Sequence, residues 1–182
     1  MTELIFFPKD ENDQDFILGI YAQEIKLRTK WIIKSANKVN SLLEREASAE
    51  RIIKEAMDLI GNAMVILRII DYTGSRKNEL EKAKERVFLI KKKWPNIPFG
   101  PPDGLRRVRN DYEHFDAKLD KWAISSGRNV IADMNVGLEI EGLNQYENLR
   151  SLNGDVLYFW DKSVSLSEVV EWAKQVTIEV SE

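Results

Sequence analysis

Apolar residues recur at helical spacing along the N-terminal part of the chain and predict two long helices. The first covers about 13–46, where Leu18, Tyr21, Ile25, Ile32 and Val39 form one stripe. The second begins after Ser48, a residue type that caps helix N-termini, and closes in a turn at Gly74. Its stripe follows the i, i+3, i+4, i+7 rule and comprises Ile53, Ala56, Met57, Ile60, Ala63, Met64, Leu67 and Ile70.

Two further helices are predicted on either side of a proline-rich loop. The third covers about 76–93 and stops before Pro95, because proline lacks a backbone donor and fixes φ. The loop, 94–104, contains four prolines and two glycines, and Asp103 near its end can cap the next helix. That fourth helix runs from about 105 to 126 and carries a seam of Leu105, Val108, Tyr112, Phe115, Leu119 and Trp122.

The last part of the chain, 127–182, changes character. The runs "NVIADM" (129–134) and "DVLYFWD" (155–161) are rich in β-forming residues next to Gly and Asn turn signals, and we expect them to pair in a β-hairpin. A terminal helix follows, with Ser165 and Glu168 spaced as a capping box. The predicted fold is mainly α: a four-helix up-down bundle over 13–126, with the hairpin and terminal helix packed on the same domain.

The composition of the chain excludes several kinds of chemistry but says little about the fold. The chain has 182 residues and no cysteine, so thiol catalysis, disulfides and cysteine zinc sites are excluded. No signal peptide or membrane-spanning segment is expected, and a cytoplasmic location is the prediction. The net charge is −3, but residues 75–109 carry eleven Lys and Arg against four acidic residues, a net of +7. This block is either a solvated helical face or a surface for a polyanion.

The only histidine, His114, lies just beyond that basic block in the stretch "LRRVRNDYEHFDAKLDKW". With Leu105 and Tyr112 on the buried seam, the heptad register places His114 off the core. Metal-free cleavage of RNA needs a group that titrates near neutral pH and a fixed cation beside the phosphate. Arg109 suits the second task because a guanidinium can hold two phosphate oxygens. The alternative is a solvated histidine with no chemical role.

The string "RNDYEH" resembles the signature of the HEPN superfamily (higher eukaryotes and prokaryotes nucleotide-binding domains). Its ribonuclease members carry an arginine, usually followed by Asn, Asp or His, and a histidine after four to six intervening residues. The resemblance covers about 13–126, with the motif on the fourth helix. It implies a metal-independent endoribonuclease without a cofactor, which leaves 2′,3′-cyclic phosphate ends and acts as a homodimer paired through the fourth helix. It also implies a setting in toxin–antitoxin systems or phage defence, with an antitoxin or regulatory protein as a partner.

The expected site therefore divides into catalytic and RNA-binding residues. The catalytic set is Arg109, His114 and Asn110, and the RNA-binding set is Arg106, Arg107, Lys91, Lys92 and Lys93. Arg107 lies one heptad before His114 and is the alternative phosphate partner. Glu113 and Asp116 either crowd an RNA site with negative charge or pair with Arg109 and Arg106.

Helix geometry constrains how this motif can act. On one straight helix, Arg109 and His114 point about 140° apart. Either the first turn bends, or two chains pack their fourth helices about a two-fold axis and pool the groups. The alternative function is a catalytically inactive HEPN-like module that binds a nucleotide or a protein.

Overall fold

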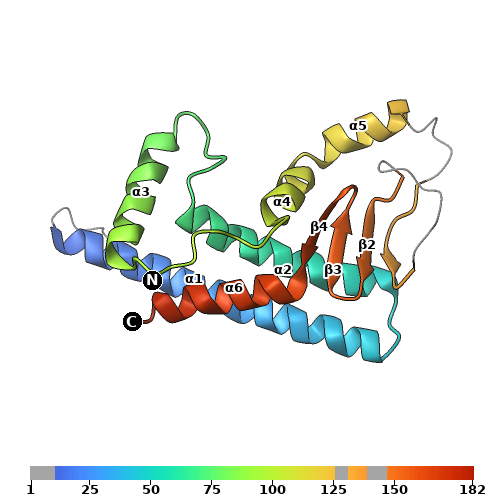
Figure 1. Cartoon of the computed structure of the whole chain (residues 1–182), viewed down its shortest axis with the longest axis horizontal. Coiled ribbons are helices and arrows are strands. Elements are labelled where there is room, and N and C mark those ends of the chain that lie inside the picture. The colour runs from blue at the N-terminus through green and yellow to red at the C-terminus, as the bar shows by residue number, and fades with distance from the viewer. Residues whose placement is uncertain (1–10, 126–130, 139–146) are drawn as a thin grey trace, which may run out of the picture.

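The computed structural model describes residues 11–125, 131–138 and 147–182, and its secondary structure is mainly helical with one small sheet (Figure 1). The helices are α1 (Glu11–Glu44), α2 (Ala49–Ile70), α3 (Leu80–Lys93), α4 (Leu105–Glu113), α5 (Phe115–Ser125) and α6 (Leu166–Glu179). The strands are β1 (Asn135–Val136), β2 (Arg150–Asn153), β3 (Val156–Phe159) and β4 (Lys162–Ser165). No described helix combines the length and the apolar character needed to cross a membrane.

Helices α1, α2 and α6 pack side by side and form the main hydrophobic core (Figure 1). The apolar stripe predicted for α2 is buried almost throughout, which makes this helix the centre of the core. Polar contacts fix α6 against α1: the buried Thr29 hydroxyl donates to the Ala173 carbonyl at 3.2 Å and accepts from Thr177 at 2.7 Å. The terminal helix therefore shares the main core with α1 and α2.

The cap of α6 follows the predicted capping box in part. The Ser165 hydroxyl accepts a hydrogen bond from the Glu168 backbone N–H at 3.2 Å. Asp155 lies beside this helix end and accepts hydrogen bonds from the Ser165 and Ser167 hydroxyls. These hydrogen bonds hold the pKa of the Asp155 carboxyl below its usual value. Ser48, by contrast, caps α2 through its backbone carbonyl, with no side-chain hydrogen bond.

The sheet has four strands in the order β1-β2-β3-β4, with β1 parallel to β2 and the other pairs antiparallel. Leu152, Leu157 and Val164 stand opposite one another across β2, β3 and β4, and all three are buried. Residues 129 and 130 of the predicted first strand lie outside the described part of the chain. The predicted pairing of 131–134 with 155–161 is wrong, since Ala132 bridges to Asn148, while β3 pairs with β2 and β4. Short turns join these neighbours, and adjacent antiparallel strands with short turns pair at a low entropic cost.

Helix α3 stands across the N-terminal part of α1 and the C-terminal end of α2, and the proline-rich loop returns the chain over α6 to α4 (Figure 1). The Trp172 indole N–H donates to the Pro98 carbonyl at 3.0 Å and fixes this loop on α6. At the end of the loop, Gly104 has a φ of +82° and lies against the backbone of Ser163 in β4. A side chain has no room there, so glycine sets how closely α4 approaches the sheet.

The predicted fourth helix is interrupted at His114, which lies between α4 and α5 with a φ of −115° and a ψ of 40°. The sequence 105–125 contains neither glycine nor proline, so no local breaker explains the interruption. Tertiary contacts accompany it: the Phe115 ring packs 5.4 Å from that of Trp160, and both lie against Phe159. The seam is correspondingly incomplete, because Tyr112 is 46% exposed instead of buried.

Candidate functional site

A cavity of about 930 Å³ opens where the end of α2, the turn after it, α3 and α4 meet. Its lining is unusually rich in charge for a cavity of this size. The cations are Arg68, Arg76, Lys82, Arg86 and Arg109, the carboxylates are Asp71, Glu79 and Glu113, and His114 and Tyr21 also line the cavity. A second cavity of about 610 Å³ between α1 and α2 contains lysines and carboxylates but no arginine or histidine.

Arg109 supplies the buried cation of the cavity. It lies on α4, and its side chain is only 9% exposed. One guanidinium nitrogen lies 3.3 Å from the Glu113 carboxylate, while Nε has no hydrogen-bond partner. Burial, together with the nearby charges of Arg68 and Arg106, lowers the pKa of Arg109. Gly74, with a φ of +85°, lets the turn pass close to this guanidinium, since an added Cβ would lie 3.2 Å from it.

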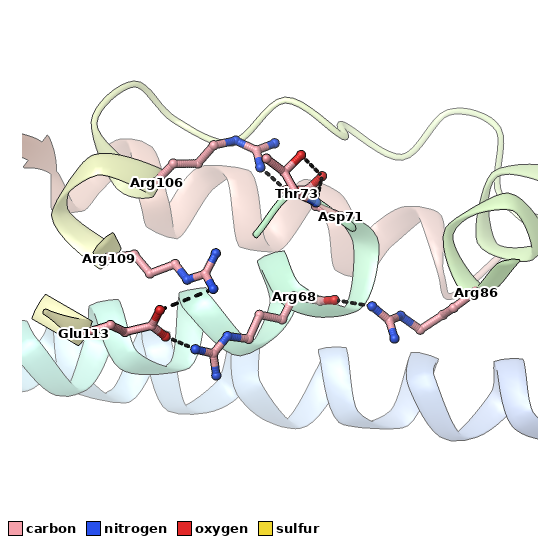
Figure 2. Close-up of polar contacts among 7 residues, drawn as sticks. All are labelled: Arg68, Asp71, Thr73, Arg86, Arg106, Arg109 and Glu113. Atoms are coloured by element: carbon pink, nitrogen blue, oxygen red, sulfur yellow. Dashed lines mark hydrogen bonds and ion pairs between the residues drawn. The ribbon is translucent and has the colours of Figure 1, made fainter. Parts of the chain in front are cut away.

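Two carboxylates partly neutralise the arginines around the end of α2 (Figure 2). Glu113 is shared: one oxygen pairs with Arg109 and the other with Arg68, so the carboxylate lies between the two guanidinium groups. Asp71 pairs with Arg106, and burial lowers the pKa of that arginine. The cluster contains three guanidinium groups and two carboxylates, which leaves an excess of positive charge.

Arg86 on α3 binds the backbone at the C-terminal end of α2. Its Nε donates to the Ile69 carbonyl at 3.0 Å and another guanidinium nitrogen donates to the Arg68 carbonyl at 2.8 Å (Figure 2). The last carbonyls of a helix lack intrahelical partners and carry partial negative charge. Arg86 therefore caps α2 and attaches α3 to it.

His114 is exposed, as the register predicts, and lines the same cavity as Arg109. Within the described part of the chain, no hydrogen bond or ion pair occupies its imidazole. The expected divergence of about 140° between the two side chains assumed one straight helix. Because α4 ends at Glu113, His114 leaves that helical track, and a single chain brings both motif residues to one cavity.

The other predicted residues lie outside the cavity lining. Asn110 is exposed on α4, and Arg107 pairs with Asp103 at 2.6 Å on the surface, so Arg109 is the motif arginine that lines the cavity. Arg106 is held in its pair with Asp71.

The three lysines form the C-terminal end of α3 and do not line the cavity. Lys91 lies over the Phe99 ring at 4.8 Å, Lys93 pairs with Asp15 at 2.9 Å, and Lys92 is exposed. These three predicted residues therefore lie on the outer surface, away from Arg109 and His114.

Sequence reasoning missed Arg68, Arg76, Lys82 and Arg86 as lining residues. Arg68 left a signal, since it is the one charge inside the otherwise apolar end of α2, "AMVILRII". Its neighbours Ile69 and Ile70 are buried while Arg68 faces the cavity. The Arg68 side chain is 57% exposed, so the signal is a lone charge among apolar residues and not a cost of burial.

The geometry can do two things chemically. A buried, partly unsatisfied guanidinium can bind an oxyanion, and an exposed imidazole in the same cavity can transfer a proton beside it. Comparison with known proteins finds no family model, no curated protein and no solved structure that matches this chain. The site must therefore be interpreted from its own residues.

Proposed function

We propose that the protein is a metal-independent endoribonuclease of the HEPN type. The observation that carries the proposal is that Arg109 and His114, the two defining residues of the motif, line one cavity in one chain. Their presence in the same cavity supports the chemistry that the motif implies, because Arg109 contributes a fixed positive charge and His114 a titratable nitrogen.

In this mechanism His114 accepts the proton of a ribose 2′-hydroxyl. The 2′-oxygen then forms a bond to phosphorus as the bond from phosphorus to the 5′-oxygen breaks, and the leaving oxygen takes up a proton from solvent. Arg109 stabilises the charge that develops on the phosphoryl oxygens. The products are a 2′,3′-cyclic phosphate and a free 5′-hydroxyl.

The wider proposal includes RNA as the partner and the basic block of 75–109 as its binding surface. It also includes homodimerisation through α4 and a setting in toxin–antitoxin systems or phage defence, with an antitoxin or regulatory protein. Arg109 and His114 line one cavity of a single chain, so helix geometry alone gives no reason for a second chain. The dimer therefore depends on the family resemblance alone.

The test is RNA cleavage in the presence of EDTA. We expect wild type to produce 2′,3′-cyclic phosphate ends, and His114→Gln to lower the rate at least about 100-fold. Arg109→Lys keeps the charge but loses the fork, and we expect a rate loss of similar size. Lys92→Ala removes a predicted RNA-binding cation outside the cavity, and the matched control is Lys30→Ala, an exposed cation outside both the basic block and the cavity.

Two results contradict the proposal: wild-type protein that leaves RNA intact, or a His114→Gln variant with full activity. Each variant is compared by melting temperature, so that a loss of folding is separated from a loss of chemistry. Loss of activity in Lys92→Ala alone indicates binding on the outer surface and not catalysis in the cavity.

One observation favours the second candidate, an inactive HEPN-like module that binds an anionic ligand. Arg109 already has a carboxylate partner in Glu113, and Arg86 is engaged in capping α2. A module of this kind would bind a nucleotide in the same cavity without cleaving RNA. It is distinguished by nucleotide binding that survives His114→Gln while no cleavage occurs in wild type.

A further inference from the structure

The cluster at the end of α2 contains more positive than negative charge. Arg68 and Arg106 both lie close enough to Arg109 to disfavour its charged form, and burial acts in the same direction. Asp71 neutralises Arg106. Glu113 alone must then serve both Arg68 and Arg109. Arg68 and Arg109 both line the cavity and share this one carboxylate, so this part of the wall attracts a further anion.

Arg109 is also incompletely satisfied. A guanidinium has five N–H donors, yet in the described part of the chain this buried side chain has one ion pair, with Glu113 at 3.3 Å, and its Nε has no partner. Charge-assisted hydrogen bonds are usually about 2.7–2.9 Å long. Buried donors without acceptors are costly, and an oxyanion in the cavity relieves that cost.

We propose that the Glu113 carboxylate is a resident counterion in a phosphate site formed by Arg68 and Arg109, and that a ligand phosphate binds by displacing it. A carboxylate and a phosphate present comparable pairs of oxygens to a guanidinium. Glu113 lies between the two guanidinium groups, where a phosphate would have to bind to contact both (Figure 2). The ligand phosphate is a backbone phosphate of RNA, and in this respect the inference rests on the proposed function.

The exposure of the three side chains supports displacement over a permanent structural pair. The Arg109 side chain is 9% exposed and fixed, whereas that of Glu113 is 28% and that of Arg68 57% exposed. Glu113 can therefore rotate into solvent while Arg68 follows the incoming phosphate. Arg68 becomes a phosphate-binding residue, and the charge of Glu113 sets how strongly the cavity binds anions.

Calorimetric titration with inorganic phosphate tests this without any cleavage reaction. We expect Glu113→Gln to bind phosphate about tenfold more tightly than wild type, because the competing charge is gone while the side-chain shape is kept. The matched control is Glu79→Gln, which removes one negative charge from the same cavity but touches neither arginine pair. We expect it to change affinity less than about threefold. Adding Arg68→Gln to Glu113→Gln should remove most of the gain.

The inference is overturned if Glu113→Gln binds phosphate no more tightly than wild type, or if Glu79→Gln gains as much. The first result means that Glu113 does not occupy the site, and the second that only net charge matters. If Glu113→Gln is unstable, Glu113→Asp serves instead, since it keeps the charge but draws it back from the arginines. An intermediate gain is expected, and unchanged affinity in a folded Glu113→Asp contradicts the inference.

The same measurements separate this inference from the proposed function. Tighter phosphate binding by Glu113→Gln together with an RNA-inert wild type leaves the counterion role standing and rejects the nuclease. If wild type cleaves RNA but Glu113→Gln binds phosphate no more tightly than wild type, the nuclease proposal stands and the counterion role is rejected.

Discussion

Substitution of Gly104 by alanine tests how closely α4 must approach the sheet. An added Cβ would lie 1.7 Å from the Ser163 carbonyl oxygen, and this distance would have to double to reach the 3.4 Å of ordinary contact. Ser163 is part of β4, and both neighbours are fixed backbone elements, so neither can move without disturbing its own packing. The residue also has a φ of +82°, which L-residues with a side chain rarely adopt.

Both costs can be given an approximate size. The left-handed conformation costs about 1–2 kcal/mol for alanine, and forcing extra volume into a packed contact costs about 1–3 kcal/mol. We therefore expect Gly104→Ala to lower the free energy of unfolding by roughly 2–5 kcal/mol. In a chain of this length each kcal/mol shifts the melting temperature by about 2–4 °C, so a fall of about 10 °C is expected.

The assay is thermal and urea unfolding followed by circular dichroism, with Gly154→Ala as the matched control. Gly154 also has a positive φ, +59°, but an added Cβ meets nothing within 4 Å. It therefore carries only the conformational cost of about 1–2 kcal/mol. Equal loss of stability in the two variants would refute the steric argument and show that α4 is not tightly placed against β4.

Three further predictions concern the stability of the fold. Asp155→Asn should lower stability, because hydrogen bonds from Ser165 and Ser167 hold the pKa of the Asp155 carboxyl below its usual value. In urea unfolding at several pH values, the loss relative to wild type should be constant above that usual value and should shrink as the pH falls below it. Arg86→Met should cost about 1–3 kcal/mol in urea unfolding by leaving the Ile69 carbonyl without its cap, and an unchanged midpoint contradicts that role. Thr29→Val, which keeps the shape but removes the hydroxyl between α1 and α6, should cost about 1 kcal/mol, and a neutral result means that this hydrogen bond adds nothing net.

The helices could be predicted from the sequence because their signals are local. The stripe of α2, the end of α3 before Pro95 and the Ser165 cap of α6 each depend on residues within a few positions of one another. Signals of this range need no knowledge of the rest of the fold. His114 is exposed as predicted, but the heptad register does not explain this, because the helix is interrupted there and the same register wrongly buries Tyr112.

The break at His114 could not be predicted in this way. No glycine or proline marks it, and the Phe115 ring contacts Phe159 and Trp160, which lie more than forty positions further along the chain. The strand order of the sheet could not be predicted either, because the sequence did not show which strands the short turns would join. The same limit applies to α6, because a periodic stripe indicates that one face is buried but not which helices cover it.

For the candidate site, the sequence determined which residues can carry the chemistry: a single histidine, an arginine-rich stretch before it, and no cysteine. The tertiary structure decided which arginine is buried, that Arg68 from α2 joins Arg109 from α4, and that Glu113 lies between them. The physical reason is that side-chain chemistry belongs to each residue, whereas burial and charge pairing depend on elements that are distant in sequence and meet only when the chain folds.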